Sequence, residues 1–393
     1  MAAFANTELS GIVAGQSISR EFALRLLKCS TSELPHLLAA AQQLRERRKG
    51  HIISYSRKVF LPLTNLCRDY CGYCTFRRDP GQPGAHTMTP DEVLDVVNRG
   101  ETLGCTEALF SLGDKPEAIF PEMQDGLRHL GYRSTLHYLE AMCELVLRET
   151  NLIPHANPGL LSFEWLRRLR EVSPSIGLML ESTNPSLAAH ADRAPDKDPA
   201  KRLTVIDQAG KLGIPFTTGI LIGIGESLED RVDSLFAIAA LHRKYGHVQE
   251  VIIQNFRAKS TIPMAKWPEP TMDDMLRTTA IARLILGDMN VQAPPNLSSC
   301  DYPRLLEGGI NDWGGISPLT PDFINPEAPW PHLAALQENT EAAGFTLKQR
   351  LPVYPDFLDK ARANSPKAAK HLRNLADQNG FAATAFQNAS STA

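Results

Sequence analysis

The chain has 393 residues, of which 43% are hydrophobic and 22% charged, a composition typical of a globular protein with one large domain or two ordinary ones. Lys and Arg number 41 against 44 Asp and Glu, so the chain lacks the basic excess that usually accompanies nucleic-acid binding. Its apolar runs are too short to span a membrane, and the stretch from Met1 to Glu21 lacks the features of a signal peptide. We therefore expect a cytoplasmic protein with reduced cysteines.

The predicted elements begin with helices and continue as alternating strands and helices. Residues 1–53 are expected to form a helical extension, because apolar residues recur in them at helical spacing. The predicted strands span residues 59–66, 107–112, 152–157, 176–181, 216–222, 250–255, 290–293 and 311–315. The predicted helices between and after them span residues 89–103, 135–150, 162–170, 198–212, 227–245, 271–286 and 332–343.

This alternation predicts an α/β fold, a (βα)8 barrel of the TIM type over residues 54–345. The first six βα units are marked more strongly than the last two. A doubly wound open sheet is the alternative, but polar residues recur at the carboxyl end of nearly every strand, where barrel enzymes carry their active sites. Residues 346–393 are expected to be a partly disordered tail, because the sequence beyond Pro366 is rich in Ala, Asn and Ser.

Three cysteines lie in one short run after the first predicted strand, with the spacing C-x-x-x-C-x-x-C: Cys67, Cys71 and Cys74. Three thiolates on one loop can hold a [4Fe-4S] cluster while leaving one iron open to another ligand. With Tyr73 before the last cysteine, the run resembles the motif of radical S-adenosylmethionine enzymes. A zinc site is the alternative, but zinc prefers four ligands, and His86 is separated from the motif by a Pro/Gly-rich loop.

The remaining four cysteines are scattered and are expected to be small core or surface residues. They are Cys29, Cys105, Cys143 and Cys300.

Several strand ends resemble the cofactor-binding positions of radical S-adenosylmethionine enzymes. A carboxylate at the end of the fourth strand, Glu181, could accept both ribose hydroxyls, and Arg202 could reach Glu181 and the cofactor's own carboxylate. The alternatives are an ordinary strand-to-helix turn at Gly113 and a structural Glu181–Arg202 pair. The residues assigned to the cofactor are Tyr73, Gly113, Asp114, Glu181, Ser182, Arg202, Leu221 and Gly223.

A second group of polar residues follows the third, sixth, seventh and eighth strands. Amides and an aromatic ring that converge on one mouth suit a heterocyclic substrate rich in donors and acceptors. The alternative is that they cap turns, as Asn often does. The residues assigned to the substrate are Asn157, Gln254, Asn255, Arg257, Gln292, Asn296, Asn311 and Trp313, with Asp312 as the candidate general acid/base.

Longer stretches of the sequence resemble one family, the first subunit of the deazaflavin (FO) synthases. The similar runs are residues 58–67, 104–110, 215–226, 249–257 and 309–315, and the likeness extends over about residues 54–331. It implies a subunit that takes the 4-hydroxybenzyl adduct of a ribitylaminouracil, removes a hydrogen atom by a deoxyadenosyl radical, closes the central ring and releases ammonia.

The resemblance also implies partners and leaves two alternatives. A second radical subunit would supply the adduct, and a ferredoxin or flavodoxin would supply electrons. One C-x-x-x-C-x-x-C motif indicates that only one of the two activities is present. A related radical enzyme, such as the partner subunit or a relative from menaquinone synthesis, would share the cysteines and the barrel. A zinc-stabilised binding module would share only the cysteines.

Overall fold

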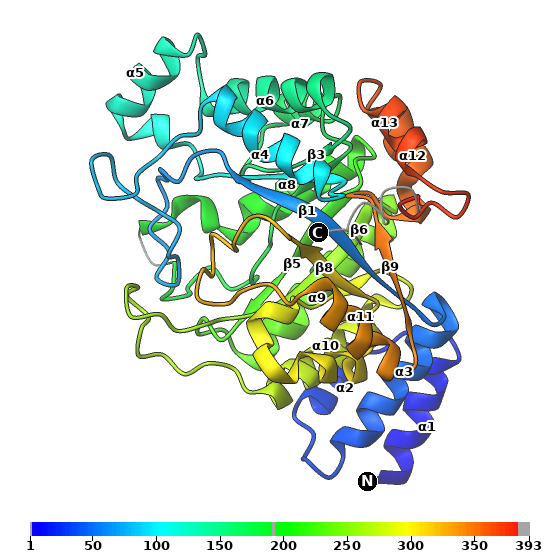
Figure 1. Cartoon of the computed structure of the whole chain (residues 1–393). Coiled ribbons are helices and arrows are strands. Elements are labelled where there is room, and N and C mark those ends of the chain that lie inside the picture. Colours follow the sequence, from blue (N-terminus) through cyan, green and yellow to red (C-terminus); the bar gives the residue numbers. More distant parts are fainter. Residues whose placement is uncertain (1, 191–192, 384–393) are drawn as a thin grey trace.

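The computed structural model describes residues 2–190 and 193–383, without the side chains of residues 2–6 and 299–300. Its nine parallel strands belong to one sheet, and β1 pairs with both β2 and β8, which closes the first eight strands into a barrel (Figure 1). The predicted TIM-type barrel is confirmed and the open sheet is wrong. The strands are β1 Ile52–Pro62, β2 Glu107–Ser111, β3 Ile153–Asn157, β4 Ser175–Gly177, β5 Phe216–Ile222, β6 Val248–Asn255, β7 Val291–Gln292, β8 Asp312–Ile316 and β9 Thr346–Arg350.

Helices lie around the outside of the barrel, close to where the sequence predicts them. Capping boxes start three of them: Thr89 before α4, Ser227 before α9 and Thr271 before α10. The helix α5 and the 3-10 helices were not predicted. The helices are α4 Pro90–Thr102, α5 Pro121–His129, α6 Thr135–Glu149, α7 Phe163–Leu169, α8 Pro199–Lys211, α9 Leu228–Tyr245, α10 Met272–Leu286 and α11 Leu333–Ala342, with 3-10 helices η1 Pro116–Ala118, η3 Pro195–Lys197, η4 Pro295–Gly308 and η5 Pro355–Phe357. None of the described helices is both long and apolar enough to cross a membrane.

The amino-terminal segment is helical, as expected, and packs on one side of the barrel. It comprises α1 Ala2–Val13, α2 Arg20–Leu27 and α3 Leu34–Lys49, and α2 and α3 lie against α9 and α10 (Figure 1). Buried leucines such as Leu37 and Leu44 provide the apolar contact. The expected boundary after residue 53 falls inside β1.

The carboxyl-terminal segment is folded, and the prediction of a frayed tail beyond Pro366 is wrong for the residues that the structure describes. Strand β9 pairs with the first half of β1, from Ile52–Thr346 to Ser56–Arg350. Two short helices follow, α12 Leu358–Asn364 and α13 Ala369–Leu375. Residues 384–393, part of the Ala/Asn/Ser-rich tail, lie outside the described residues.

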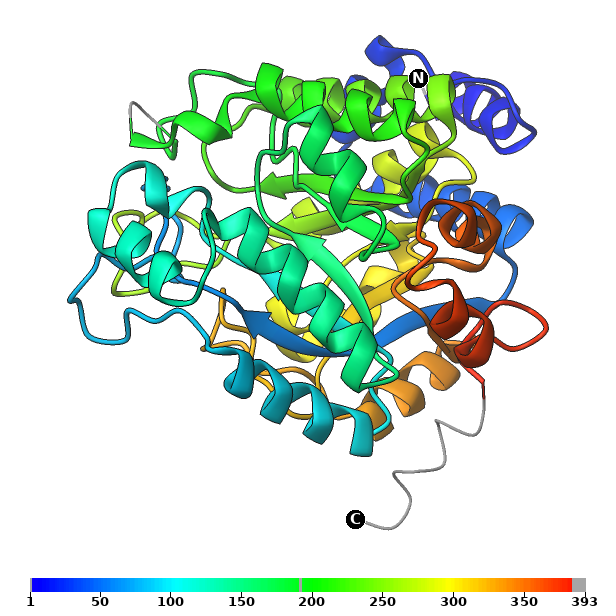
Figure 2. The same cartoon turned by 90° about the horizontal axis from the view of Figure 1, so that it is seen from above.

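This segment covers the end of the barrel where the strands begin. Lys360 donates to the carbonyl of Gly246 (2.7 Å), just before β6, and His371 Nε2 lies 3.0 Å from the carbonyl of Thr150, just before β3. Figure 2 shows α12 and α13 at one end of the molecule and the loops that follow β1 and β2 at the opposite end. The carboxyl ends of the strands therefore face the other way, toward the cysteine loop.

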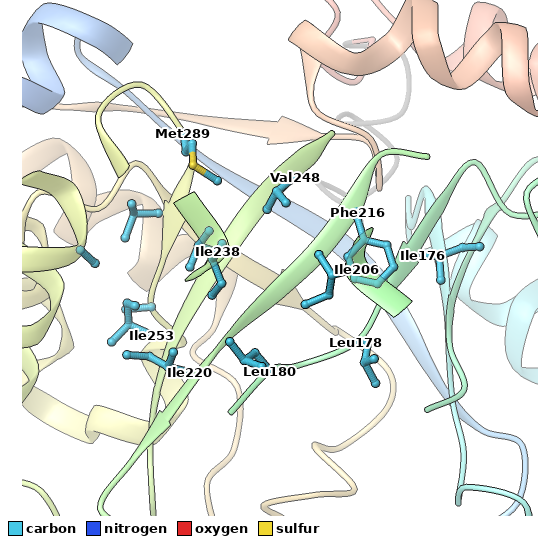
Figure 3. Close-up of a cluster of buried hydrophobic side chains, with 14 of the residues drawn as sticks. Ile176, Leu178, Leu180, Ile206, Phe216, Ile220, Ile238, Val248, Ile253 and Met289 are labelled. Carbon is cyan, nitrogen blue, oxygen red and sulfur yellow. The ribbon is translucent and has the colours of Figure 1, made fainter. Parts of the chain in front are cut away.

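The core lies between the strands and their covering helices. Figure 3 shows Ile206 of α8 and Ile238 of α9 in the same buried cluster as side chains of β4, β5 and β6. Phe216 and Ile220 of β5 point into this outer layer. Because side chains alternate along a strand, Thr217 and Leu221 point inward, where they line a cavity.

Candidate active site

A cavity of about 350 Å³ opens among the loops at the carboxyl ends of the strands and reaches into the barrel. Residues of all eight barrel strands line it, together with the three cysteines of the motif and Arg350 at the end of β9. The interior of a TIM barrel is normally filled by layers of bulky side chains. Here Gly177 and Gly315 occupy inward positions on β4 and β8, and the space of their missing side chains is taken up by His155 and Lys58, which also line the cavity.

The cysteine loop is held against the end of β2. The backbone N–H groups of Asp69 and Asp114 donate to Cys67 Sγ at 3.4 and 3.2 Å. A Cβ atom on Gly113 would lie 1.9 Å from the carbonyl oxygen of Leu66, so only glycine allows this approach. Gly113 therefore seats the cysteine loop, whereas its prediction as a cofactor contact stays a prediction.

Two observations favour an iron–sulfur cluster over zinc. Within the described residues, the only three His, Cys, Asp or Glu side chains with ligand atoms within 4.8 Å of one another are Asp69, Asp114 and Asp196. The three motif cysteines are not such a group, whereas sulfur atoms around tetrahedral zinc lie only about 3.8 Å apart, given Zn–S bonds of roughly 2.3 Å. His86 is exposed and its Nε2 lies 3.0 Å from Glu92, so it is not a fourth ligand.

Burial also shapes the chemistry of the thiols. It raises the pKa of Cys67 to about 12 and raises that of Cys71 as well. Such thiols ionise only beside a strongly positive partner, such as iron. Cys105 and Cys143 are buried in the core away from this loop, as expected. The side chain of Cys300 lies outside the described part of the chain.

Glu181 is the centre of a buried polar group beside the cysteine loop. Its carboxylate accepts hydrogen bonds from the Tyr73 hydroxyl and the Lys197 ammonium, and His190 Nε2 lies 3.1 Å away. Burial opposes ionisation of Glu181, but Lys197, His190 and Arg202 outweigh it and hold its pKa well below the usual value. Glu181 also has a φ of 66°, in the left-handed region that non-glycine residues rarely adopt and that is common at functional sites.

The structure thus brings Tyr73 and Glu181 together, but it corrects the expected partner of Glu181. Arg202 lines the cavity, yet its guanidinium donates to the backbone carbonyls of Met179 and of Asp196, the latter at 3.1 Å. Lys197 occupies the place expected for Arg202. Lys197 is the last residue of η3 and His190 lies in a turn between β4 and η3, and no pattern in the sequence marks them.

Two other residues assigned to the cofactor are engaged within the protein. The Ser182 hydroxyl accepts a hydrogen bond from the backbone of Asn184 (3.1 Å) and does not line the cavity. Asp114 lines it, but its carboxylate accepts from the backbone of Leu160 (3.0 Å) and pairs with Lys115 (3.1 Å).

The end of β5 forms an apolar wall beside the cysteine loop. Leu221 packs in a cluster with Tyr73 and Phe256, where a flat ring could lie against it. Gly223 has a φ of 92°, and its N–H donates to Glu226 (2.9 Å). The Glu226 carboxylate, which also accepts from the N–H of Ile224 (2.8 Å), therefore stabilises this turn.

Most residues assigned to the substrate line the cavity, and some carry unpaired polar atoms. Asn157, Gln254 and Gln292 end β3, β6 and β7 or lie one residue before the end, and all three face the cavity. Among the residues assigned to the substrate, three lining atoms are buried without a hydrogen-bond partner in the described part of the chain. These atoms are Asn255 Oδ1, Arg257 Nε and Asn296 Oδ1.

The other two residues assigned to the substrate serve the barrel itself. Asn311 does not line the cavity, because its carboxamide accepts from Arg283 (2.7 Å) and from the backbone of Val291 (3.0 Å). Trp313 touches the cavity, but its indole N–H donates to Thr340 of α11 (3.0 Å), and its ring packs on Tyr302.

Asp312, the candidate general acid/base, lies below the cavity and does not line it. Its carboxylate forms an ion pair with Arg350, with Nε to Oδ2 at 2.7 Å, and accepts from the Ser54 hydroxyl. Asp312 is fully buried at the first residue of β8, at the amino end of the barrel. The ion pair with Arg350 indicates a structural role for Asp312, and its catalytic role remains a prediction.

The inner part of the cavity carries charged residues that were not predicted. Lys58, Glu107, His155, Glu250 and Arg350 line it. Burial lowers the pKa of His155 to about 4, so the imidazole is neutral at pH 7, and its Nδ1 lies 2.6 Å from the Ser175 hydroxyl. The sequence could have indicated these residues, because ionisable side chains at inward positions of short apolar strands are unusual unless they serve a site.

Comparison with known proteins agrees with this geometry. The family model of the Radical SAM superfamily matches residues 61–238. A 7,8-didemethyl-8-hydroxy-5-deazariboflavin synthase from Methanopyrus kandleri is 46% identical over 334 residues, which cover 84% of this chain and 100% of that protein. The chain belongs to the deazaflavin (FO) synthase family. Membership in this radical S-adenosylmethionine family implies a [4Fe-4S] cluster and S-adenosylmethionine as cofactors.

Other relatives of the FO synthase family are longer. FO synthase from Mycobacterium tuberculosis is 52% identical over 337 residues, 83% of this chain but only 39% of that protein. The chain therefore spans about two-fifths of such relatives. Among solved structures, the [FeFe]-hydrogenase maturase HydG from Carboxydothermus hydrogenoformans has a TM-score of 0.70 at 20% identity, covering 99% of this chain and 94% of that one. Methylornithine synthase PylB has a TM-score of 0.69 at 18% identity, covering 87% and 97%. At these identities both show the fold alone.

Proposed function

We propose that this chain is the cyclising subunit of FO synthase, a radical lyase. It converts the 5-amino-5-(4-hydroxybenzyl)-6-(D-ribitylimino)-dihydrouracil adduct to the deazaflavin FO and releases ammonia, 5′-deoxyadenosine and methionine. The observation that carries the proposal is the match with the Methanopyrus synthase over that protein's entire length. A polar cavity beside the cysteine loop supports a substrate rich in oxygen and nitrogen.

The residues present fit both cofactors. Cys67, Cys71 and Cys74 would hold the cluster, and the two N–H groups that donate to Cys67 Sγ would stabilise its negative charge. Bound together, the cluster and S-adenosylmethionine supply a carbon radical able to remove a hydrogen atom. Glu181, kept ionised by its neighbours, would accept the ribose hydroxyls, and Leu221 would lie against the adenine.

The chain's own residues position the substrate and exclude water. The three buried polar atoms without partners, Asn255 Oδ1, Arg257 Nε and Asn296 Oδ1, would bond the adduct, because an unpaired buried polar atom is unfavourable until a ligand meets it. Asn157, Gln254 and Gln292, which also line the cavity, would add amide contacts. Holding the adduct within reach of the radical is the main contribution expected of such a barrel.

Two protein partners are part of the proposal. A second FO synthase subunit would supply the adduct, and a ferredoxin or flavodoxin would supply electrons in the cytoplasm. A groove outside the cavity supports the second partner. Cys74 lines both the cavity and this groove, which also carries Arg77, Arg78 and Lys259, a basic surface suited to an acidic electron carrier.

Anaerobic turnover of the synthetic adduct tests the function. Reconstituted protein with S-adenosylmethionine and dithionite should form fluorescent deazaflavin, deoxyadenosine and ammonia in equal amounts. A variant with alanine at one motif cysteine is the control and should form none of them. Deoxyadenosine without deazaflavin would refute the proposal.

Two further outcomes identify the alternatives. Production of the adduct from tyrosine and ribitylaminouracil would assign the chain to the partner subunit. Colourless protein containing zinc would indicate a binding module.

A further inference from the structure

Lys58 is a buried amine at the centre of the barrel that the proposed function does not yet use. It points inward from β1, and the residue is only 7% exposed. Within the described residues, no hydrogen-bond acceptor or carboxylate lies within bonding distance of its Nζ. Its close neighbours are the rings of Trp330 and Phe60, at 4.9 and 5.6 Å. An ammonium donates three hydrogen bonds and accepts none, so a ligand atom that meets it must be an acceptor.

The barrel makes room for this side chain by means of a glycine. A Cβ on Gly315 would lie 2.4–2.5 Å from Lys58 Cδ, Cε and Nζ, so the lysine crosses β8 where a side chain is missing. Gly314, the residue before Gly315, makes room in the same way for the side chain of Gln292 from β7. A Cβ on Gly314 would lie 1.9 Å from Gln292 Nε2. Lys58 and Gln292 therefore lie on either side of β8, each over one of two adjacent glycines, and both line the cavity.

The charges around Lys58 suit an uncharged, polar ligand. Burial lowers the pKa of Lys58, while Glu107, Asp322 and Glu250 raise it and Arg350 lowers it. Three carboxylates and one guanidinium therefore lie around the amine, and an added anion would face those three carboxylates. A neutral ring with carbonyl oxygens would satisfy the amine without adding charge.

The carboxamide of Gln292 narrows the choice further. A carboxamide donates and accepts side by side, which matches a ring imide, where a carbonyl oxygen stands beside an N–H. A phenol offers one polar atom and would leave either Lys58 or Gln292 unpaired. The pyrimidinedione ring of the adduct offers two carbonyl oxygens and an N–H between them.

We propose that Lys58 donates a hydrogen bond to a carbonyl oxygen of the substrate's pyrimidinedione ring, with Gln292 on the adjoining imide edge. This inference rests on the proposed function and deepens it. Lys58 is a specificity-determining residue that selects the dione end of the adduct. Trp330 and Phe60 stabilise the amine by contact with their ring faces when the ligand is absent.

Calorimetric titration of the reconstituted protein, with S-adenosylmethionine present, tests the contact. The probes are 5-amino-6-(D-ribitylamino)uracil, which has the dione and no phenol, and 4-hydroxybenzyl alcohol, which has the phenol and no dione. Lys58→Met should weaken uracil binding roughly 10- to 100-fold, the effect of losing one hydrogen bond to a charged group. Its affinity for the phenol should stay unchanged.

Two further variants separate the contact from general damage. Gly315→Ala keeps the lysine but displaces its amine, and it should weaken uracil binding several-fold. Lys49→Met removes a half-buried lysine, which pairs with Asp356 (3.5 Å) outside the cavity, and this variant should bind both probes as the wild type does. Circular dichroism confirms that each variant is folded.

The outcomes distinguish this inference from the proposed function. Unchanged uracil affinity in Lys58→Met, loss of phenol rather than uracil binding, or no uracil binding by the wild type would each overturn the inference. If one of these results is obtained while the wild type forms FO from the adduct, the inference about Lys58 is wrong and the proposed function stands. If uracil binding depends on Lys58 but the adduct yields no FO, the proposed function falls and the contact stands.

Discussion

Replacing Arg350 with methionine tests how the floor of the barrel is held together. The Arg350 guanidinium is buried between two carboxylates, with Nε 2.7 Å from Asp312 and a terminal nitrogen 2.9 Å from Glu250. Tyr354 donates to the same Glu250 oxygen at 2.9 Å. Since β9 carries Arg350, this network joins the carboxyl-terminal segment to β6 and β8.

The expected loss of stability follows from the two carboxylates that remain. Removing one partner of a buried ion pair destabilises a protein by about 3–5 kcal/mol, because the other charge stays buried without compensation. Burial already raises the pKa of Glu250 above its ordinary value of 4.5, and Arg350 opposes that rise. Without Arg350 this pKa rises further, so the folded state binds more protons than the unfolded state. Stability of the variant should therefore fall as the pH rises above 4.5.

Arg283→Met is the matched control. Arg283 is also fully buried, but it donates only to neutral oxygens, those of Gly309, Gly287, Met289 and Asn311. Its loss should destabilise the protein without that dependence on pH. Urea unfolding of both variants and the wild type at about pH 5 and about pH 8 measures the difference. Equal losses for the two variants at both pH values would refute the reasoning.

Three further predictions concern the site. Alanine at any motif cysteine should abolish iron binding and turnover, whereas the Cys105→Ala variant should bind iron as the wild type does. Iron analysis and the visible absorption spectrum measure this difference. A motif variant with a full complement of iron would contradict the ligand assignment. Glu181→Gln should weaken S-adenosylmethionine binding roughly 10-fold or more with the cluster intact, and an unchanged dissociation constant would leave Glu181 as a partner of Lys197 alone. The Asn255→Ala variant should still cleave S-adenosylmethionine slowly but form little deazaflavin. Measuring deoxyadenosine and deazaflavin in one reaction tests this. A normal yield of deazaflavin would show that Asn255 only stabilises a turn.

Local signals in the sequence located most of the barrel. The capping residues Thr89 and Ser227 mark the starts of α4 and α9, and the apolar run of residues 216–222 marks β5. Asn157 and Gln292 were also placed correctly, at the ends of β3 and β7. Each of these signals involves residues that are close together in the sequence, so they can be recognised without knowledge of the tertiary structure.

Long-range contacts account for the errors. Residues 346–350 read Thr-Leu-Lys-Gln-Arg, too polar for a predicted strand, and they become β9 only by pairing with β1. Asp312 was assigned to the mouth of the barrel, but β8 begins with it, so it lies at the opposite end. Lys197 reaches Glu181 from the end of η3, and that contact depends on the tertiary structure between β4 and α8.

The pairing of β9 with β1 also determines when the barrel can be completed during synthesis. The first half of β1 leaves the ribosome before any other strand, yet its partner Thr346 is made only after β8. Until then, the backbone groups of residues 52–56 on that edge lack their partner and can pair with other chains. Chains elongate at roughly 5–20 residues per second, so this edge stays open for tens of seconds. Protection of this edge from aggregation therefore depends on the synthesis of β9.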